Sequence, residues 1–501
     1  MVVSNSLDFD PVLLEWPPFL ATVVVLGHSF GRLMETTTAI ILAAGLGTRM
    51  VSAQPKVMHC VCGAPILHYV VRAALDAGCN DVVVVAGHGR ASVEAYLARA
   101  FAGESVRIAL QANQRGTGDA ARVGIESIGS DVESVLILNG DVPLVTATEL
   151  KAVIDALARA KLSLATSVVD DPRGYGRILR KMGRVAEIRE HRDLRSEEER
   201  SIREVNAGIY AAEVSLLREA LAALVPQNAQ GELYLTDVVA HSSRAGHEVE
   251  AVPLGADALA GVNDRDQLVS VEQVMFSRIA RRWRVAGATV RPGAFIDADA
   301  VLEADVTVET GAALRGRTRV RRGASIDVGC VLTDVDVGEG AVVKPYCVAS
   351  QSVIGPGAQV GPFSHLRKDS EIGADAHVGN FVETKNTRLA RGAKANHLAY
   401  LGDGDIGEKA NVGAGTIFCN YDGFQKHRTS IGAGAFIGSD SQIVAPVTIG
   451  AGAYVATGTT VTRDVPEDAL AISRVPQENK EGYASRLRAR LKAAKGESEK
   501  K

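Results

Sequence analysis

Aromatic residues are scarce, at 5% of the sequence, whereas glycine is plentiful, at 50 residues. Charge of one sign is not in excess, because the net charge is only −4. No global basic field therefore points to nucleic acid, and anionic ligands would need local arginine and lysine residues. With 501 residues, 46% of them hydrophobic and 23% charged, the chain is typical of a globular protein with two or more domains.

Cysteines are few and scattered, and long apolar runs are missing. The six cysteines include Cys60-Val-Cys62, which lacks the two-residue spacing of a zinc knuckle or redox motif. We therefore expect free thiols in a reducing cytoplasm. The apolar run from Trp16 to Leu26 is too short to span a bilayer, and no basic flank of a signal peptide precedes it. We expect residues 1–37 to form a poorly ordered extension. The alternative is an upstream start codon, with the true start at Met34.

A six-residue period runs from about Ile296 to Val461 and is the most informative feature of the sequence. An aliphatic residue returns at each sixth position, often followed by Gly, as in Ile431-Gly-Ala-Gly-Ala-Phe436. Neither a helix nor an alternating strand gives this spacing. Hexapeptide repeats are typical of a parallel β-helix, in which three short strands make one triangular coil. We expect the aliphatic residues to point into a stiff column of stacked coils.

The aliphatic phase shifts three times along this repeat. One register holds Ile296 to Ile326, a second holds Ile354 to Val378, a third holds Ile406 to Val412, and a fourth holds Ile431 to Val461. We predict an insertion at each of the three breaks, because a stacked solenoid expels extra residues as surface loops. Loops on a rigid scaffold are where function concentrates.

The second and third breaks carry polar residues that suit acid–base chemistry. His397 is a natural general base for taking a proton from an amine at neutral pH. A lone loop histidine is more often a simple hydrogen-bonding residue, but here Lys385, Tyr400, Asn411 and Asn420-Tyr421 accompany it. Catalysis is therefore the better hypothesis, with lysine and arginine offsetting the charge of an anionic ligand.

The first half of the chain alternates buried strands with helical patterns. Continuous apolar runs predict strands at 38–44, 81–86, 107–111 and 134–139, with a helical pattern such as 65–78 between them. This alternation is typical of a parallel sheet with helices on both faces. Ligands then bind at the carboxyl ends of the strands.

Three loops at those strand ends carry candidate phosphate chemistry. Gly45 to Arg49 offers backbone N–H groups and a positive charge, although it matches neither the dinucleotide fingerprint nor the Walker A pattern. Alone, this loop is better explained as a plain strand-to-helix turn. Gln111 to Thr117 is again glycine-rich. Asn139-Gly-Asp141 ends a strand in a carboxylate, which suits Mg²⁺ beside phosphates or, equally, a helix cap.

The joint between the halves shows a helical pattern from Asp264 to Arg284. We expect a linker helix laid across the mouth of the β-helix. A nucleic-acid patch is the rival interpretation of Arg281-Arg-Trp-Arg284, but no wider basic surface supports it.

Several motifs occur in the same order as in the sugar-nucleotide pyrophosphorylases. They are Leu42 to Met50 with Pro55-Lys56, Gln111 to Gly118, Asn139 to Pro143, Gly174 to Ile178, Asn228 to Asp237, and Gly261 to Arg265. With the hexapeptide half behind them, the chain resembles the bacterial bifunctional N-acetylglucosamine-1-phosphate uridylyltransferase / glucosamine-1-phosphate N-acetyltransferase family from about Thr38 to about Gly482.

The resemblance implies a fold of the α/β class followed by a column. A Rossmann-like nucleotidyltransferase domain would span 38–265, a linker helix 266–290, and a left-handed parallel β-helix acetyltransferase domain 291–482. A C-terminal helix and tail would span 483–501. Relatives are homotrimers, so we expect a homotrimeric cytoplasmic enzyme that supplies a precursor of the cell wall, for peptidoglycan and lipopolysaccharide. No nucleic-acid or membrane partner is expected.

The first implied reaction is uridylyl transfer from UTP to N-acetylglucosamine 1-phosphate, with Mg²⁺ as the cofactor. Asp141 and Asn263 would hold the metal, and Arg49 and Lys56 would be catalytic by neutralising phosphate charge. Gln111 would offer a donor and an acceptor to the uracil edge. The residues implied to bind UTP and the product are Leu42, Ala43, Ala44, Gly45, Lys56, Gln111, Gly116, Thr117, Asn139, Gly140, Asp141, Gly176, Glu190, Asn206 and Asn263. Of these, Gly176, Glu190 and Asn206 would hold the sugar.

The second implied reaction, which comes first in sequence of synthesis, is acetylation of glucosamine 1-phosphate by acetyl-CoA. His397 would be the catalytic base. The residues implied to bind glucosamine 1-phosphate are Arg367, Lys385, Tyr400 and Asn411. Those implied to bind acetyl-CoA are Ala414, Asn420, Tyr421, Ser439, Thr457 and Arg474. Relatives more often carry Ala at Thr457 and a Pro-Gly pair at Lys368-Asp369, so the loop around Arg367 can bend differently.

Two other functions stay open on the sequence alone. One is a single-activity sugar-nucleotide pyrophosphorylase whose β-helix is regulatory or oligomerising, and the residues around His397 argue against it because a passive column does not need them. The other is a non-catalytic scaffolding protein, against which the intact pair of Asp141 and Asn263 argues.

Overall fold

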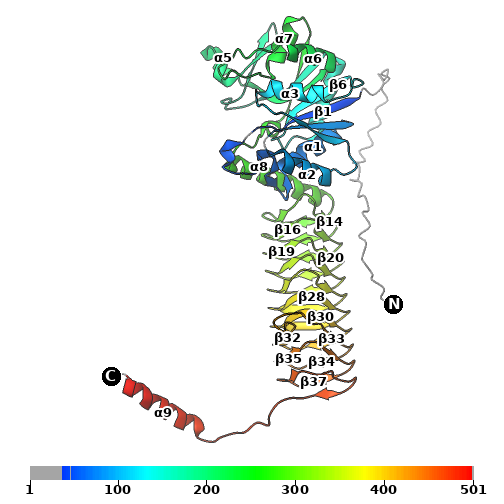
Figure 1. Cartoon of the computed structure of the whole chain (residues 1–501), viewed down its shortest axis with the longest axis vertical. Coiled ribbons are helices and arrows are strands. Elements are labelled where there is room, and N and C mark those ends of the chain that lie inside the picture. The colour runs from blue at the N-terminus through cyan, green and yellow to red at the C-terminus, as the bar shows by residue number, and fades with distance from the viewer. Residues whose placement is uncertain (1–35, 46, 88, 499–501) are drawn as a thin grey trace.

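The computed structural model describes residues 36–45, 47–87 and 89–498. An α/β half stands on a long column, and helix α9 (Tyr483–Ser498) lies beyond the far end of the column (Figure 1). The predicted extension lies outside the described residues as far as residue 35, and Thr37 already belongs to strand β1. Among the described helices, none has the length and apolar character that a membrane crossing requires. All six cysteines are free, as predicted.

The first half is built around a nine-stranded sheet in the order β11-β7-β10-β6-β1-β4-β5, with β8 and β9 joined through β10. Strands β1, β4, β5 and β6 are mutually parallel, as predicted, whereas β10 runs antiparallel to both of its neighbours in that order. The strands are β1 (Thr37–Leu42), β4 (Asp81–Ala86), β5 (Val106–Leu110), β6 (Ser134–Asn139), β7 (Leu162–Val168), β8 (Arg177–Lys181), β9 (Arg184–Arg189), β10 (Glu204–Glu213) and β11 (Val249–Pro253).

Helices cover both faces of this sheet. They are α1 (Ile66–Asp76), α2 (Arg90–Ala100), α3 (Thr117–Glu126), α4 (Ala147–Asp155), α5 (Glu197–Ser201), α6 (Val214–Ala222) and α7 (Asp237–Arg244), with short turns η1 (Thr48–Met50), η2 (Lys56–Met58), η3 (Ala156–Ala158), η4 (His191–Asp193) and η5 (Ala256–Leu259), and a small hairpin of β2 (Cys60–Val61) and β3 (Ala64–Pro65). Ile41 packs in one core with α1, α2 and α4, whereas its neighbour Ile40 packs in another with α3, α6 and α7. Because side chains alternate across a strand, the continuous apolar run reflects burial on both faces.

The second half is a parallel β-helix made of two sheets. The eleven-stranded sheet contains β12 (Thr289–Val290), β15 (Thr307–Val308), β18 (Ser325–Ile326), β21 (Val342–Val343), β24 (Gln359–Val360), β27 (His377–Asn380), β29 (Lys394–His397), β31 (Asn411–Val412), β34 (Phe436–Ile437), β37 (Tyr454–Val455) and β39 (Leu470–Ala471). The seventeen-stranded sheet bends around the rest of the column and contains β13 (Phe295–Ile296), β14 (Val301–Leu302), β16 (Ala313–Arg315), β17 (Arg319–Val320), β19 (Val331–Thr333), β20 (Asp336–Val337), β22 (Val348–Ser350), β23 (Val353–Ile354), β25 (His365–Leu366), β26 (Glu371–Ile372), β28 (Glu383–Leu389), β30 (Tyr400–Ile406), β32 (Ile417–Cys419), β33 (Thr429–Ile431), β35 (Gln442–Val444), β36 (Val447–Ile449) and β38 (Thr460–Val461).

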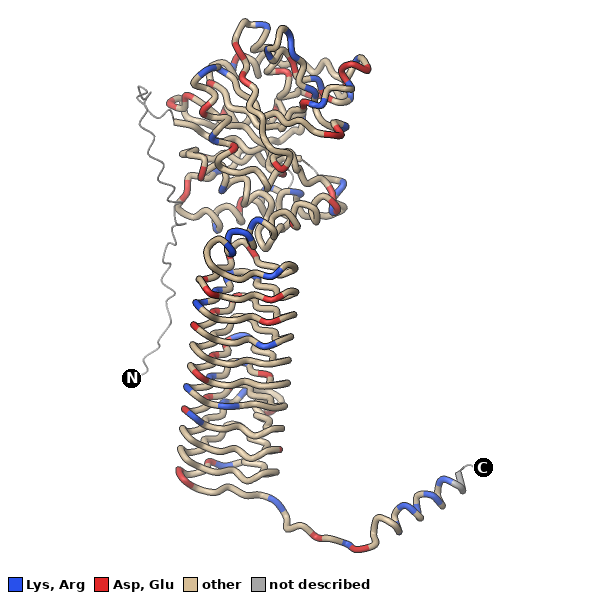
Figure 2. Tube along the Cα trace, turned by 180° about the vertical axis from the view of Figure 1, so that it is seen from behind, with Lys and Arg blue, Asp and Glu red and all other residues tan. Residues whose placement is uncertain are grey.

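The aliphatic residues that define the six-residue period fill the inside of the column. Each of them, from Ile296 to Val461, is at most 4% exposed. The residues on either side of them in each short strand point outward, so the outer surface carries the polar and charged groups. Basic and acidic residues are interspersed along the column, and the charged residues of α9 are mainly basic (Figure 2).

Two of the three predicted insertions are wrong. The first break contains two sides of five residues instead of six, from Leu332 to Val337 and from Ala349 to Ile354. The second break again contains two, from Thr384 to Leu389 and from Leu401 to Ile406. A shortened side shifts the aliphatic phase just as an insertion does, so the sequence alone cannot separate the two. Only the third break is an insertion, in which residues 420–428 leave the column between β32 and β33.

Helix α8 (Arg265–Val285) lies between the two halves, across the top of the column, as predicted (Figure 1). Its buried Met275 and Ile279 belong to one apolar cluster that also contains Val61 of the first half and Ile296 of the column. The guanidinium of Arg282 stacks on the Trp283 ring at 4.6 Å. The two halves and the helix therefore share a continuous core.

Candidate active sites

Three loops meet at the carboxyl ends of the parallel strands, where the sequence predicts a nucleotide site. Strand β1 pairs with β6 so that Leu42 lies opposite Asn139, and the N–H of Gly140 donates to the Leu42 carbonyl at 2.9 Å. The side-chain amide of Gln114 donates to the Ala44 carbonyl and joins the first loop to the second. A cavity of about 620 Å³ opens beside Gln111. The residues that this sheet edge carries are Leu42, Ala43, Ala44, Gly45, Gln111, Gly116, Thr117, Asn139, Gly140 and Asp141.

Lys56, Asp141 and Asn263 converge at this edge from three distant parts of the chain. The Nζ atom of Lys56 forms an ion pair with Asp141 and donates to Oδ1 of Asn263 at 3.2 Å. The N–H of Val262 donates to the Asp141 carbonyl at 2.9 Å and keeps the two oxygen-bearing residues side by side. One ammonium group contacts both side-chain oxygens, so these oxygens point towards the same place.

This donor set fits a magnesium ion. One carboxylate and one amide oxygen are the hard ligands that Mg²⁺ prefers, and Mg²⁺ takes its other ligands from phosphates and water. Within the described residues, no group of three or more His, Cys, Asp or Glu side chains is placed to hold a metal. Asp141 and Asn263 would therefore supply two oxygen ligands, and phosphates and water would supply the others.

Arg49 is not brought into the Lys56 cluster. It lies exposed on η1, and no contact joins it to Asp141 or Asn263 in the described part of the chain. The glycine before this turn is required, because Gly47 has φ +59° and a Cβ there would lie 2.7 Å from Cβ of Lys56. The first loop thus passes directly over the lysine.

A carboxylate that the sequence analysis missed orients Gln111. The side-chain nitrogen of buried Gln111 donates to Oδ2 of Asp119 at 2.9 Å and to the Gly116 carbonyl at 3.4 Å. Burial would raise the pKa of Asp119, but hydrogen bonds from Gln111 and Arg115 hold this pKa below its usual value. The nitrogen end of Gln111 is therefore engaged, and its carbonyl oxygen is the end that a ligand can reach. Asp119 lies eight residues after Gln111 and belongs to no motif that would have predicted this contact.

The three residues predicted to hold a sugar also lie together. The N–H of Asn206 donates to the Gly176 carbonyl at 2.9 Å, and a Cβ at Gly176 would lie 3.3 Å from Oε1 of Glu190. Asn206 donates its side-chain N–H to the hydroxyl of buried Tyr210 at 2.7 Å. Burial raises the pKa of Glu190, and the charges of Asp193 and Asp237 raise it further.

A second cross-brace links the Lys56 segment to the start of α8. One guanidinium nitrogen of Arg265 lies 3.3 Å from Nδ1 of buried His59. Desolvation, followed by the charge of Arg265, lowers the pKa of His59 and favours the neutral ring that can accept this hydrogen bond. The Lys56–Asn263 and His59–Arg265 contacts thus join the same two segments, and no motif predicted the second contact.

The β-helix gathers the predicted sugar-phosphate residues on its larger sheet. Leu366 pairs with Thr384, and Thr384 with Leu401, so the outward residues that follow them, Arg367, Lys385 and Gly402, lie one above another. Arg367 makes an ion pair with Glu383 at 2.8 Å. Tyr400 begins the strand that carries Gly402. Asn411 differs, because it lies on β31 of the eleven-stranded sheet.

A lysine from the inserted segment joins this group. The ammonium of Lys426 lies beside that of Lys385 and, by its contact and its charge, is the main cause of a lowered Lys385 pKa. Lys426 pairs across the segment with Tyr421. Two neighbouring ammonium groups with Arg367 nearby suit a dianionic phosphate. Sequence analysis missed Lys426 because it lies beyond Asn420-Tyr421, the pair predicted to contribute to the site, and has no motif of its own.

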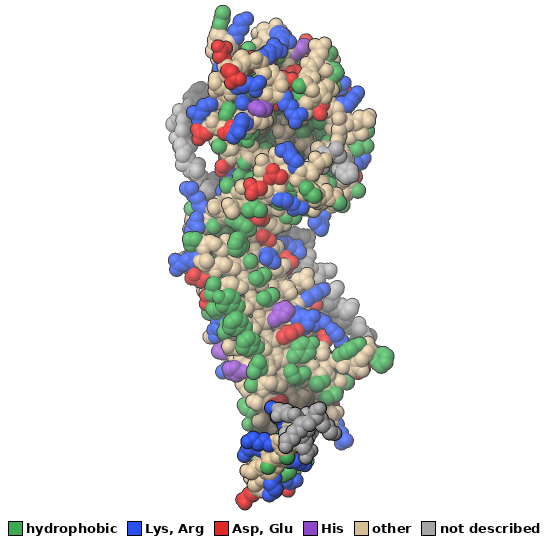
Figure 3. Space-filling view, turned by 90° about the vertical axis from the view of Figure 1, so that its left-hand side faces the viewer, with side chains coloured by type: hydrophobic (Ala, Val, Ile, Leu, Met, Phe, Trp, Pro, Cys, Tyr) green, Lys and Arg blue, Asp and Glu red, His purple; other side chains and the backbone are tan. Residues whose placement is uncertain are grey.

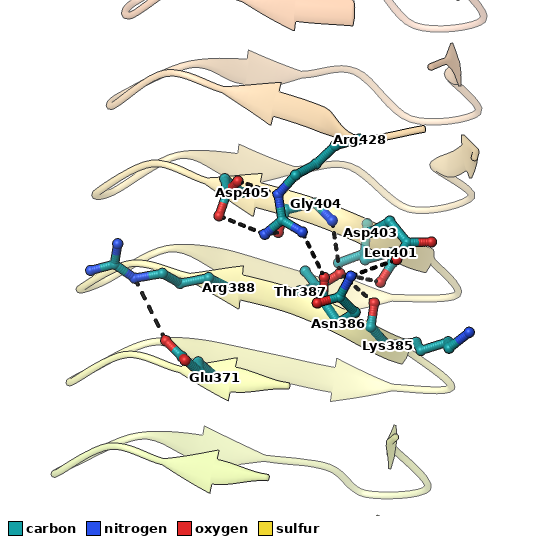
Figure 4. Close-up of polar contacts among 10 residues, drawn as sticks. All are labelled: Glu371, Lys385, Asn386, Thr387, Arg388, Leu401, Asp403, Gly404, Asp405 and Arg428. Atoms are coloured by element: carbon teal, nitrogen blue, oxygen red, sulfur yellow. Dashed lines mark hydrogen bonds and ion pairs between the residues drawn. The ribbon is translucent and has the colours of Figure 1, made fainter. Parts of the chain in front are cut away.

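Asp403 and the two glycines around it order the floor of this site (Figure 4). Asn386 donates to Oδ1 of Asp403 at 2.7 Å, and Asn420 donates to Oδ2 at 2.5 Å. A Cβ at Gly402 would lie 2.5 Å from the Tyr400 hydroxyl and 2.7 Å from Nδ2 of Asn420. Only glycine therefore lets a predicted sugar contact and a predicted coenzyme contact meet at this corner.

The remaining residues that were predicted to bind the coenzyme lie along one corner of the column, below His397. The N–H of Gly415 donates to the Leu398 carbonyl, that of Asp440 to the Ala414 carbonyl, and that of Gly458 to the Ser439 carbonyl, all within 3.0 Å. Arg474 donates to the Thr457 carbonyl at 2.7 Å. His397 is exposed at the end of β29. The corner residues that form this line are His397, Ala414, Ser439, Thr457 and Arg474.

Comparison with known families assigns both halves to transferases. Residues 39–240 match the MobA-like NTP transferase domain, and residues 351–386 and 428–463 match the bacterial transferase hexapeptide (six repeats). The matched segments contain the loop edge of the sheet and the coils around Lys385 and Ser439.

Curated relatives match almost the whole chain. Bifunctional protein GlmU of Sorangium cellulosum (strain So ce56) is 63% identical over 463 residues, which cover 91% of this chain and 98% of the relative. GlmU proteins of Anaeromyxobacter sp. (strain Fw109-5) and Anaeromyxobacter dehalogenans (strain 2CP-1 / ATCC BAA-258) are each 49% identical, over 90% and 91% of this chain and 93% and 94% of theirs. An NTP-transferase sheet, a hexapeptide column and this degree of identity along both place the chain in the family of bifunctional GlmU proteins.

Proposed function

We propose that the chain makes UDP-N-acetylglucosamine in two steps, one in each half. The enzyme is a nucleotidyltransferase and an acetyltransferase, as both of its halves and its relatives indicate. The first step acetylates glucosamine 1-phosphate with acetyl-CoA on the β-helix. The second transfers uridylyl from UTP to N-acetylglucosamine 1-phosphate on the α/β half and releases pyrophosphate. Because UTP and acetyl-CoA are used inside the cell, we infer a cytoplasmic enzyme.

Uridylyl transfer requires two phosphate groups to be aligned and their charges to be offset. An oxygen of the sugar phosphate attacks the α-phosphorus of UTP, and the bond from that phosphorus to pyrophosphate breaks. The loop edge would hold the nucleotide, with the carbonyl of Gln111 facing uracil. Gly176, Glu190 and Asn206 would hold the sugar. Lys56 and Arg49 would neutralise phosphate charge.

Mg²⁺ is the cofactor that the donor set supports. Asp141 and Asn263 would hold it, since their oxygens already converge on one cationic group. When bound, the ion supplies charge neutralisation between the nucleotide and the sugar phosphate. Lys56 would then turn from these oxygens towards the phosphates, which keeps one positive charge at each place.

Acetyl transfer requires a neutral amine held against a thioester. Arg367, Lys385 and Lys426 would bind the phosphate of glucosamine 1-phosphate, and Tyr400 would orient the ring. His397 would take a proton from the amine as the N–C bond forms, while the C–S bond breaks and coenzyme A leaves as the thiol. The corner line from Ala414 to Arg474, together with Asn420 and Tyr421, would hold acetyl-CoA.

A homotrimer accounts for two further features of the column. Asn411 lies on a different sheet from Lys385 and Tyr400, so a neighbouring column is needed for it to complete their site. In the coils above Leu398, the residue after His397, exposed rings of Tyr346, Phe363 and Phe381 stack at 5.4 Å spacings. The flank of the column in Figure 3 shows hydrophobic side chains in groups. Such a strip is typical of an interface, and replacement of Phe363 by Asp should reduce the particle mass in light scattering.

The single observation that carries the proposal is that cationic side chains gather at two separate places. Lys56 contacts Asp141 and Asn263 in the first half, and Lys385 lies beside Lys426 on the column. The test supplies glucosamine 1-phosphate, acetyl-CoA, UTP and Mg²⁺ together. UDP-N-acetylglucosamine should form, and omission of acetyl-CoA should prevent it. A need for pre-acetylated sugar would instead favour the alternative, a single-activity pyrophosphorylase with a regulatory or oligomerising β-helix.

A further inference from the structure

The inserted segment 420–428 is fastened at both of its ends to strand β30. At its start, Asn420 donates to Asp403 at 2.5 Å. At its end, Arg428 pairs with Asp405 and donates to the carbonyls of Gly404 and Asn386 at 3.3 Å (Figure 4). The segment carries Tyr421 and Lys426, so whatever fixes its ends also sets the position of those side chains.

The carboxylate of Asp403 is the more constrained of the two anchors. It is only 8% exposed, and it accepts one hydrogen bond on each oxygen, from Asn386 in the coil above and from Asn420 in the coil below. The residue has φ +52°, a conformation that suits Asp, Asn and Gly. Its position is therefore determined by the backbone and by both neighbours.

A carboxylate at this place leaves Asn420 only one orientation of its amide. An ionised carboxylate only accepts hydrogen bonds, so it forces Asn420 to turn its nitrogen inward and leaves the carbonyl oxygen as the acceptor on the ligand side. An Asn420 amide free to turn over would present either end to a ligand. The charge also acts on the cationic floor, because Asp403 offsets the mutual repulsion of Lys385 and Lys426 and lies near Arg428.

We infer that Asp403 is a positioning residue for acetyl transfer, which fixes the orientation of the Asn420 amide towards the coenzyme and anchors the segment that carries Tyr421 and Lys426. This inference rests on the proposed acetyl transfer. Asp403 does not touch either substrate. Its role is to select one of two orientations of a neighbour, so its loss should weaken coenzyme binding more than sugar-phosphate binding.

The experiment compares Asp403→Gly with Asp403→Asn in the full-length chain. Glycine accepts φ +52° without strain but offers no acceptor. Asparagine retains one acceptor oxygen, which can still bind the Asn420 amide. Its nitrogen would then face Asn386, which is exposed and can turn its own amide over to accept that hydrogen bond. We expect the KM for acetyl-CoA to rise at least about tenfold in Asp403→Gly, the size expected for a lost hydrogen bond to a charged group, and by less than about threefold in Asp403→Asn. The KM for glucosamine 1-phosphate should rise less than that for acetyl-CoA in Asp403→Gly, because the lost anchor of the Lys426 segment is offset by removal of a negative charge beside the lysines.

Two controls keep the outcome interpretable. Asn386→Gly, also at a left-handed position (φ +47°), removes the other partner of Asp403 and should leave the KM for acetyl-CoA within about twofold. Uridylyl transfer, measured with N-acetylglucosamine 1-phosphate, should be unchanged in all variants and reports that the chain is folded. An unchanged KM for acetyl-CoA in Asp403→Gly, or an equal rise in both KM values, would overturn the inference. A wild-type chain that does not acetylate glucosamine 1-phosphate would instead overturn the proposed function.

Discussion

Replacement of Gly402 by Ala should separate acetyl transfer from stability. A Cβ there would lie 2.5 Å from the Tyr400 hydroxyl and 2.7 Å from Nδ2 of Asn420. Non-bonded atoms are comfortable at about 3.5 Å, so each group must withdraw by roughly 1 Å. Tyr400 is half-buried and Asn420 is only 5% exposed, but neither belongs to the apolar cluster that fills the column, so both can move without disturbing that core.

The expected loss follows from that displacement. A misplacement of about 1 Å costs about 100-fold in rate, or about 2.7 kcal/mol. We therefore expect kcat/KM for acetylation to fall about 100-fold in Gly402→Ala. The assay measures the release of the free coenzyme A thiol. Uridylyl transfer, measured as pyrophosphate release, should be unchanged, and the unfolding temperature should shift by less than about 1 °C.

Gly404→Ala is the matched control two residues away. A Cβ there would lie 2.6 Å from a ring carbon of Phe418, which is 1% exposed in the core of the column. Overpacking of this kind costs about 1–3 kcal/mol, so this variant should lower the unfolding temperature. If Gly402→Ala keeps full acetyl transfer, or loses stability as Gly404→Ala does, the assignment of this corner to substrate contacts is refuted.

Three further predictions address the individual sites. Asp141→Ala should lower uridylyl transfer more than 100-fold in the presence of Mg²⁺, because the charge stabilisation supplied there amounts to several kcal/mol, and should leave acetyl transfer intact; loss of both activities would indicate misfolding instead. His397→Ala should lower acetyl transfer by about 10²–10⁴-fold, with uridylyl transfer unaffected; full acetyl transfer in this variant would exclude His397 as the base. Burial raises the pKa of Glu190, so its ionised form costs stability at neutral pH, and Glu190→Gln should raise the unfolding temperature at pH 7.5 by about 2 °C. This gain should vanish as the pH falls below the ordinary glutamate pKa of about 4.3, where the carboxyl is protonated in both states; a gain that persists there would contradict the burial argument.

The column was predictable because its rule is local and repeats. The side-chain direction of Ile354 or Ile431 follows from its place in the hexad, and each of the aliphatic positions is buried as the period requires. The phase breaks were less predictable, since a five-residue side and an expelled loop leave the same trace in the sequence. Contacts between coils, such as Leu332 above Ala349, decide which has occurred.

The sites were predictable where a residue belongs to a motif and not where a contact depends on packing. Lys56, Asp141 and Asn263 are far apart in the sequence, and their motifs anticipated that they would meet. Asp119 and Lys426 have no motif of their own. Asp119 accepts a hydrogen bond from Gln111, and Lys426 lies beside Lys385. Such partners follow from the register of strands and the course of a loop, which are properties of the whole fold.

The upper part of the column has a consequence for how the two activities are spaced. The strands that hold Val308 and Val320 pair with the coils above and below them, and no predicted site residue lies on them. They serve as a spacer whose length is independent of either reaction. One whole coil, such as residues 303–320, could therefore be excised with the ends rejoining in register, which would bring the two catalytic centres closer by one rung without altering the residues of either.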